Sequence, residues 1–253
     1  TLSGADVVTA GACAADGLII NTSGIELDCD GNTIRGSNTG TGINFSRDTN
    51  RSIVRECNLS DFDAGIHLEY NATMHYIISN NITQMDNVGI NVTHEANNTN
   101  MSYNHVFKIR GDAIYISGFN TTSEYDTVHN NTLNAYHLYN TSVNFIKSPF
   151  ANESARENGI LFEFVNSTNL TDIAARGNNM SGIRILNSSR GNIIELGSYE
   201  YNALVGARND FAGFEIDDGS RDNIIRNNTL QHNRRGLTIG KTREALNNTF
   251  LGN

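Results

Sequence analysis

A short alternating motif that recurs at a nearly fixed interval constrains the fold of this 253-residue chain more than any other feature. The motif is a small residue followed by apolar residues at alternate positions. It occurs at residues 42–45, 65–68, 89–92, 113–116, 135–138, 159–162, 182–185, 213–216 and 236–239. Successive copies lie about 22 to 24 residues apart, a period typical of solenoid proteins. One longer step precedes residue 213, and we expect it to carry a surface loop around residues 201–210.

A second motif, which begins with Asn, lies between these copies. It occurs at Asn32, Asn58, Asn81, Asn131, Asn179, Asn228 and Asn248. Each repeat therefore contains at least two short strands separated by Gly, Asn and Asp turns, and these compositions disfavour helices.

Stacking the repeats would satisfy both apolar and polar groups. It would align one internal column of Ile43, Ile66, Ile90, Ile114, Ile160 and Ile183. Inward Asn amides at the turns would bond to the coils above and below, which satisfies their buried polar atoms. The sequence thus predicts an all-β parallel solenoid of about nine or ten coils, forming a single domain over residues 1–253.

The chain resembles the right-handed parallel β-helix proteins of the pectin-lyase-like group. The opening Gly17-Leu18-Ile19-Ile20 and residues 25–36, Ile-Glu-Leu-Asp-Cys-Asp-Gly-Asn-Thr-Ile-Arg-Gly, carry this resemblance, which extends over essentially the whole chain. It is most similar to the short-repeat branch of periplasmic copper-binding, nitrous-oxide-reductase-maturation proteins and archaeal surface proteins. The resemblance implies a single-stranded right-handed β-helix. It implies no single activity, because this fold hosts lyases, hydrolases, epimerases, adhesins and structural rods.

Charge and hydropathy exclude several kinds of partner. The formal net charge is -9, and no run of Lys or Arg occurs, so we expect neither nucleic acid nor an anionic membrane as partner. No apolar stretch approaches the ~18 residues that span a bilayer, so we expect no transmembrane segment. The Met residues are scattered and no His pair has ligand spacing, so we expect no metal and no cofactor.

The two ends of the chain suggest how it begins and associates. Residues 1–20 start with Thr1, as in a processed chain, and contain a strand-like piece that would partly cap the first coil. Residues 245–253 stop in mid-repeat without a cap. We therefore expect either that the protein continues past Asn253 or that another subunit stacks on this end. End-to-end stacking of identical rods would give a homo-oligomeric filament, and other surface proteins are alternative partners.

Acceptor sequences for N-linked glycans are unusually frequent. Nineteen Asn-x-Ser/Thr sequences occur, whereas composition alone gives about six. The sequence predicts glycans at turn or outward positions, namely Asn44, Asn71, Asn91, Asn97, Asn120, Asn140, Asn166 and Asn187. Those inside the Asn-Asn-Thr motif, such as Asn81 and Asn130, could instead be interior. This pattern favours a secreted protein at the cell surface.

The three cysteines match no zinc or redox motif. Cys29 and Cys57 lie about one repeat apart, so they could stack as small apolar groups in adjacent coils. The alternative is a Cys13–Cys29 disulfide that holds the first coil in an oxidising compartment.

Acidic residues give weak candidates for a site. Asp217 and Asp218 resemble the paired Asp of pectin-degrading hydrolases, but the His-Gly and Arg-Ile-Lys elements of those enzymes are missing after them. Cross-strand salt bridges, such as Arg184 with Glu215 and Lys241 with Asp218, and an Asp-Gly turn explain these acids as well, and we favour that explanation. Asp28 and Asp30 could touch a calcium ion, or simply form a turn.

Two classes of function follow. The first is a glycosylated structural or adhesive surface protein that assembles end to end. The alternative is a polysaccharide-active lyase or hydrolase, or a carbohydrate-binding module, on one face of the solenoid. Tyr115 and Tyr139 would be the sugar platforms of such a module, and clustering of aromatic residues in one groove would favour it.

Overall fold

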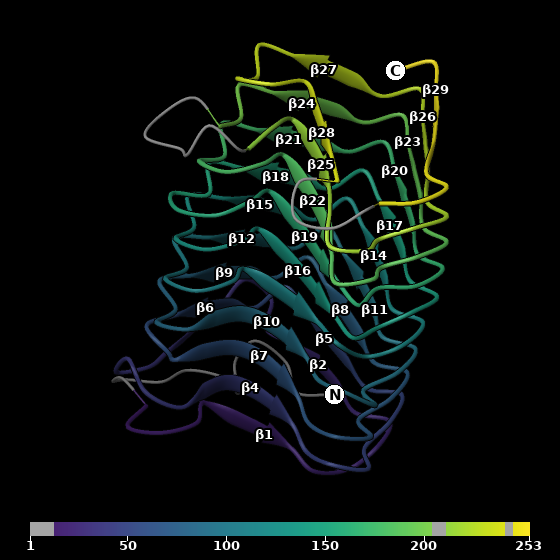
Figure 1. Cartoon of the computed structure of the whole chain (residues 1–253). Coiled ribbons are helices and arrows are strands. Elements are labelled where there is room, and N and C mark those ends of the chain that lie inside the picture. The colour runs from purple at the N-terminus through teal and green to yellow at the C-terminus, as the bar shows by residue number, and fades with distance from the viewer. Residues whose placement is uncertain (1–12, 204–210, 241–244) are drawn as a thin grey trace.

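A computed structural model describes residues 13–203, 211–240 and 245–253. In this part of the chain every regular element is a β-strand, and the strands form three parallel sheets that run the length of the molecule (Figure 1). Nine coils contribute a strand to all three sheets, and a tenth contributes to two of them. The expectation of an all-β parallel solenoid of about nine or ten coils is confirmed.

Each coil passes through sheet 1, then sheet 2, then sheet 3. Sheet 1 contains β1 (Leu18–Ile20), β4 (Thr41–Phe45), β7 (Ala64–Leu68), β10 (Val88–Val92), β13 (Ile114–Ile116), β16 (Tyr136–Tyr139), β19 (Ile160–Glu163), β22 (Ile183–Leu186), β25 (Phe214–Ile216) and β28 (Leu237–Ile239). Sheet 2 contains β2 (Glu26–Asp28), β5 (Ile53–Arg55), β8 (Tyr76–Ile78), β11 (Asn100–Ser102), β14 (Thr122–Glu124), β17 (Phe145–Lys147), β20 (Asn169–Thr171), β23 (Ile193–Glu195), β26 (Ile224–Arg226) and β29 (Thr249–Leu251). Sheet 3 contains β3 (Thr33–Arg35), β6 (Asn58–Ser60), β9 (Asn81–Thr83), β12 (His105–Phe107), β15 (Thr127–His129), β18 (Phe150–Asn152), β21 (Ala174–Arg176), β24 (Ser198–Glu200) and β27 (Thr229–Gln231).

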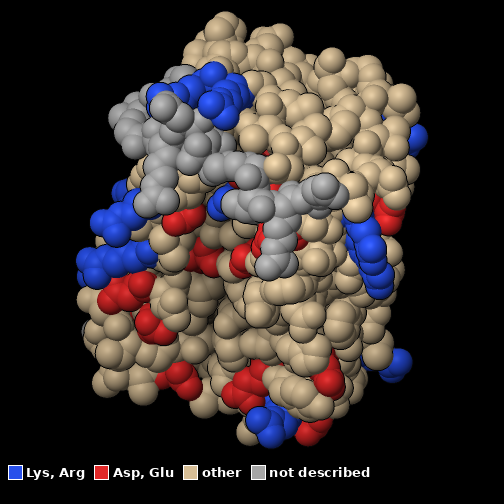
Figure 2. Space-filling view, in the orientation of Figure 1, with Lys and Arg blue, Asp and Glu red and all other residues tan. Residues whose placement is uncertain are grey.

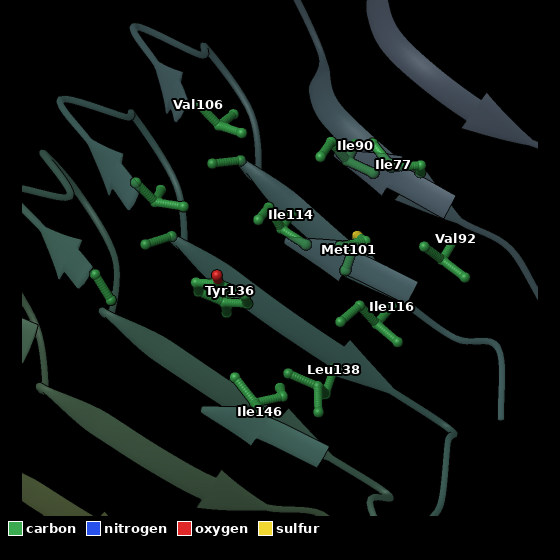
Figure 3. Packing of buried hydrophobic residues seen from close by; sticks show 14 of the residues in the cluster. Ile77, Ile90, Val92, Met101, Val106, Ile114, Ile116, Tyr136, Leu138 and Ile146 are labelled. Atoms are coloured by element: carbon green, nitrogen blue, oxygen red, sulfur yellow. The ribbon is translucent and has the colours of Figure 1, made fainter. Parts of the chain in front are cut away.

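The predicted internal column of Ile residues exists in sheet 1. Ile43 pairs with Ile66, and Ile66 pairs with Ile90, and all three are fully buried. The column passes through Tyr136, which replaces Ile between Ile114 and Ile160 (Figure 3). No coil could bury these side chains alone, so apolar burial depends on stacking.

Asn side chains join the coils at the turns between the sheets. At the turn from sheet 2 to sheet 3, the side-chain oxygen of Asn80 accepts from the amide of Cys57, and that of Asn104 accepts from both the amide and the side chain of Asn80. Asp126 continues this ladder by accepting from Asn104. In the next coil, the position equivalent to Asp126 is occupied by Pro149, the only proline of the chain. A proline has no N–H to continue the ladder.

In the Asn-Asn pairs at residues 80–81 and 130–131, the inward member is not the glycan acceptor. Asn80 and Asn131 are buried, whereas the acceptors Asn81 and Asn130 are half-buried and exposed. The alternation of a strand explains the difference, because adjacent side chains point to opposite faces.

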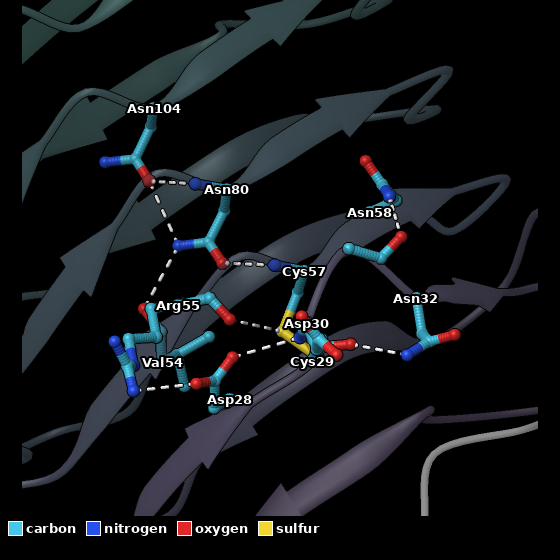
Figure 4. The surroundings of a disulfide bond; sticks show 11 residues. Asp28, Cys29, Asp30, Asn32, Val54, Arg55, Cys57, Asn58, Asn80 and Asn104 are labelled. Carbon is cyan, nitrogen blue, oxygen red and sulfur yellow. Dashed lines mark hydrogen bonds and ion pairs between the residues drawn. A yellow bond between two sulfur atoms is a disulfide. The ribbon is translucent and has the colours of Figure 1, made fainter. Parts of the chain in front are cut away.

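The disulfide joins Cys29 to Cys57, so the predicted Cys13–Cys29 pairing is wrong (Figure 4). Cys29 directly follows β2 and Cys57 directly precedes β6 of the next coil, and their Cα atoms are 4.8 Å apart, one strand spacing. Cys13 instead lies beside sheet 3, where its amide donates to the carbonyl of Arg35, and its thiol is free. The alternative prediction placed Cys29 and Cys57 in adjacent coils correctly but missed their bond.

No helix in the described ranges is long and apolar enough to cross a membrane. The expected loop around residues 201–210 lies largely outside the described residues, as does most of the predicted N-terminal cap.

We predict that Asp126→Asn flattens the dependence of stability on pH. Burial raises the pKa of Asp126 to about 6 from an ordinary 3.8, against hydrogen bonds from Ser123 and Asn104 that favour the charged form. Because the folded pKa lies above the unfolded one, the stabilisation is complete below about pH 4 and is lost as the pH rises through about 6, a change of about 3 kcal/mol. Urea denaturation across this range should show the loss in the wild type and not in the variant. Equal slopes would contradict a proton on native Asp126.

We also predict that a Cys29→Ala, Cys57→Ala double variant loses about 2–4 kcal/mol in the free energy of unfolding, because the unfolded chain regains the freedom that the bond removes. Cys13→Ala is the matched control and should retain most of that stability. Chemical denaturation of the three proteins measures this, and equal losses would show that the bond does not form.

Candidate functional site

The outer face of sheet 1 brings together His, Arg, Glu and Tyr side chains from neighbouring coils. Its central outward column is the paired series Asn44, His67, Asn91, Tyr115, His137, Leu161, Arg184, Glu215 and Thr238. Figure 2 shows this face, with acidic side chains in a hollow along its middle and most Lys and Arg side chains nearer the margins.

His137 is the centre of the site. Its Nδ1 lies 2.7 Å from Oδ2 of Asp112, and its Nε2 lies 3.0 Å from Oε2 of Glu163. Both ring nitrogens face a carboxylate oxygen, which is an acceptor, so the ring satisfies both only as an imidazolium.

The fold positions both carboxylates through contacts between coils. Asp112 is the acceptor of an Asn ladder at the turn from sheet 3 to sheet 1, because its Oδ1 accepts from the amide and the side chain of Asn134 at 2.9 Å each. Glu163 pairs with Tyr139 across the sheet, and its Oε1 accepts from the side chain of Asn187 at 2.8 Å. Each carboxylate therefore has one oxygen held by the scaffold and one directed at His137.

The surroundings favour the charged form of His137. Burial is the largest influence and lowers its pKa, but the hydrogen bonds and charges of Asp112 and Glu163 together outweigh burial and raise the pKa above the ordinary value. The structure thus holds the His137 ring between two carboxyl groups that favour its charged form.

A third carboxyl group, that of Glu157, has a raised pKa, so its environment favours the neutral form. Burial raises its pKa, the charge of Asp112 raises it further, and the cations Arg184 and His137 lower it. Next to it, Arg184 forms a 3.1 Å ion pair with Glu215, whose side chain is fully buried and also accepts from the Ser181 hydroxyl. A carboxyl group with a raised pKa beside other carboxyl groups is the usual arrangement for acid–base chemistry on sugars.

Aromatic rings border this cluster. Tyr115 meets the ring of His137 edge-on, with ring centroids 5.1 Å apart, and lies parallel to Tyr139 at 6.5 Å. Phe164 meets Tyr139 edge-on. A pocket of about 270 Å³ adjoins them, and it is lined by Asn87, Val88, Asn91, Gly111, Asp112, Tyr115 and Leu133. The two predicted sugar platforms, Tyr115 and Tyr139, therefore lie together beside the charged cluster.

The predicted acidic pair lies apart from an open surface. Asp217 is 1 % exposed, and Asp218 with Gly219 forms a turn in which both residues have positive φ. The predicted Arg184–Glu215 salt bridge is confirmed. The expected neighbour of Asp218, Lys241, lies outside the described residues.

Asp28 and Asp30 form a turn with a salt bridge. Asp28 forms a 2.7 Å ion pair with Arg55, and its other oxygen accepts from the amide of Asp30 (Figure 4). This geometry is that of the turn-forming alternative. Across the described ranges, no group of three or more His, Cys, Asp or Glu residues is arranged to hold a metal ion.

The predicted glycan acceptors fall into two groups. Asn71, Asn120 and Asn140 are exposed at the turns from sheet 1 to sheet 2, while Asn97 and Asn166 are half-buried there. Asn44, Asn91 and Asn187 are half-buried and lie on or beside sheet 1. The amides of two of these, Asn44 and Asn187, already donate to Glu69 and Glu163, so a glycan on either would disturb a carboxylate.

The acidic cluster was not predicted from the sequence because Asp112 and Glu157 lie in turns. The outward strand positions of the repeat do not concentrate acidic residues. The available signal was an acidic residue three or four positions before an outward strand residue, as in Asp112 before Tyr115 and Glu157 before Leu161.

Comparisons with known proteins agree with the architecture. Residues 7–150 match the family model described as right handed beta helix region. No curated protein matches the sequence. Among solved structures, the enzymatically active domain of bacteriophage CBA120 tailspike protein 2 is similar, with 13% identity and a TM-score of 0.61 over 91% of this chain and 42% of that one. The chain thus spans less than half of that tailspike domain.

Two epimerases are also similar. The A-module of Azotobacter vinelandii mannuronan C-5 epimerase AlgE4 has 10% identity and a TM-score of 0.58 over 94% of this chain and 75% of that one. The periplasmic alginate epimerase AlgG has 13% identity and a TM-score of 0.58 over 91% and 60%. At such identities the likeness shows the fold alone.

We predict that Glu163→Gln lowers the pKa of His137. The variant removes one of the two anions that stabilise the imidazolium, so burial has the larger effect. An NMR titration of the His137 ring measures this directly. Glu195→Gln, a change of equal charge on sheet 2, is the control and should leave the titration unchanged. A pKa of His137 that does not move in Glu163→Gln would show that the ring is not held between the two carboxylates.

Proposed function

We propose that this chain, which belongs to the right-handed β-helix family, binds a polysaccharide on the outer face of sheet 1 and hydrolyses one of its glycosidic bonds. The observation that carries the proposal is the cluster in which the His137 ring lies within hydrogen-bonding distance of Asp112 and Glu163, beside Glu157, whose pKa is raised by burial.

Glu157 is the proton donor. A carboxyl group whose pKa is raised stays protonated nearer to neutral pH and can protonate the oxygen of the departing sugar. Asp112 and Glu163 each accept a hydrogen bond from His137. They stabilise the positive charge that develops on the sugar ring as the bond breaks.

Glu163 is the base. It lies on the strand itself, and its side chain is 23% exposed against 16% for Asp112, so a water molecule can reach it more readily. It accepts a proton from the attacking water, whose oxygen bonds to the sugar carbon, while Glu157 supplies a proton to the leaving oxygen. His137 is a positioning residue because it acts through the two carboxylates.

The aromatic residues are the binding platform. Tyr115 and Tyr139 present rings beside the charged cluster, and the pocket next to Tyr115 offers room for a sugar unit. Aromatic rings with a polar tip suit sugars, which have an apolar face and a rim of hydroxyls.

The similar solved structures support a polysaccharide rather than another ligand. Two of them are named as epimerases of mannuronan and of alginate, and the third as an enzymatically active domain of a tailspike. Secretion, glycosylation and end-to-end assembly stay predictions beside this proposal. Carbohydrate binding without cleavage is the alternative that the next experiment separates.

We predict that Glu157→Gln lowers the rate of polysaccharide cleavage at least about 100-fold, because general acid catalysis contributes about 10²- to 10⁴-fold. The affinity for the polysaccharide should stay unchanged. A panel of polysaccharides screened for new reducing ends identifies the substrate, and kinetics on it then test the variant.

The control is Glu200→Gln, which makes the same change on sheet 3. Full activity in Glu157→Gln would overturn the role of this residue. Binding that is weakened by Tyr139→Ala, without cleavage by the wild type, would indicate a binding module instead.

A further inference from the structure

The hollow on the outer face of sheet 1 contains more acidic groups than basic ones. Among the described residues, four carboxyl groups interact there with two cationic groups: Asp112, Glu157, Glu163 and Glu215 with His137 and Arg184. The excess of acid is therefore local and does not merely reflect the net charge of the chain.

Each of the two cations is already matched by acid. His137 directs its ring nitrogens at Asp112 and Glu163. Arg184 faces Glu215, whose carboxylate is fully buried and has one oxygen, Oε1, with no hydrogen-bond partner. A buried carboxylate placed directly behind the only Arg of the column cancels the charge that an acidic sugar would require.

The acidic character continues along the same face. Glu69 and Asp16 lie beside His67, and burial lowers the pKa of this His, so it adds no charge. At the margin, Arg110 is largely exposed and forms an ion pair with Asp86. The residues that line the pocket at Tyr115 include no cation.

We propose that the hollow accepts glycans that lack acidic groups and rejects uronate-containing or sulfated ones. The inference rests on the proposed function and narrows its substrate class. A sugar carboxylate entering the hollow would approach like charges in a partly buried setting, where screening by water is weak. Such a substrate also fits hydrolysis, because elimination and epimerisation begin with loss of a proton beside a sugar carboxylate, which these glycans lack.

The test uses matched pairs of polymers. Homogalacturonan, alginate and glucuronan are each compared with their own carboxyl-reduced forms, which keep the linkage and lose the charge. We expect the reduced form of any pair that binds to bind about 100-fold more tightly than the native form, since like-charge contacts cost several kcal/mol. The difference should shrink as salt is raised. Tighter binding of a native polyuronate, or a difference that salt does not change, would overturn the inference while leaving polysaccharide binding intact.

A charge-deleting variant tests the same point from within the protein. Glu215→Gln exposes the charge of Arg184 and should raise the affinity for native polyuronate about 10-fold. Glu195→Gln, which also breaks an ion pair with an Arg but on sheet 2, should have no effect. Circular dichroism verifies that both variants fold. If Glu215→Gln does not fold, the salt series on the wild type still tests the inference. If neither the native nor the reduced polymer of any pair binds, the proposed function is overturned as well.

Discussion

Hydrogen bonding between successive coils is the constraint on which the rest of this structure depends. A strand of three to five residues buries too little apolar surface to be stable, and each coil has only such strands to offer. Stacking solves this for the Ile side chains, but it also buries the turns, whose polar groups then need partners. The Asn ladders supply those partners by accepting from a backbone amide and donating to a backbone carbonyl of the neighbouring coil, as Asn104 does toward Asn80 and Ile77. The high Asn content is therefore a structural requirement of the fold.

The same hydrogen-bonded ladders also position the functional site. Asp112 occupies a ladder position, so the hydrogen bonds that hold the turn also fix one oxygen of a carboxylate at the edge of sheet 1. His137 and Glu163 come from the two following coils, and the strand spacing brings them within hydrogen-bonding distance. The interaction that stabilises the scaffold thus also sets the geometry of the charged cluster. A variant that shifts the register of one coil should disturb both.

Much of the fold was predictable because stacking converts sequence period into spatial position. The column from Ile43 to Ile114 and the cross-strand pair of Arg184 with Glu215 follow from counting residues. The acidic cluster did not follow, because Asp112 and Glu157 lie in turns, where the number of residues varies between coils. The disulfide was missed for a related reason: Cys29 and Cys57 are 28 residues apart, more than one usual repeat, because Cys29 begins its turn and Cys57 ends the corresponding turn of the next coil.

Glycosidic hydrolysis by the cluster around His137 is the central claim, and isotope labelling of the cleaved bond tests it most directly. Cleavage of a polysaccharide in ¹⁸O-labelled water, followed by mass spectrometry of the products, shows where the water oxygen goes. Hydrolysis predicts one labelled oxygen at each new reducing end and saturated sugars at each new non-reducing end. An unsaturated non-reducing end without label would show elimination and contradict the account.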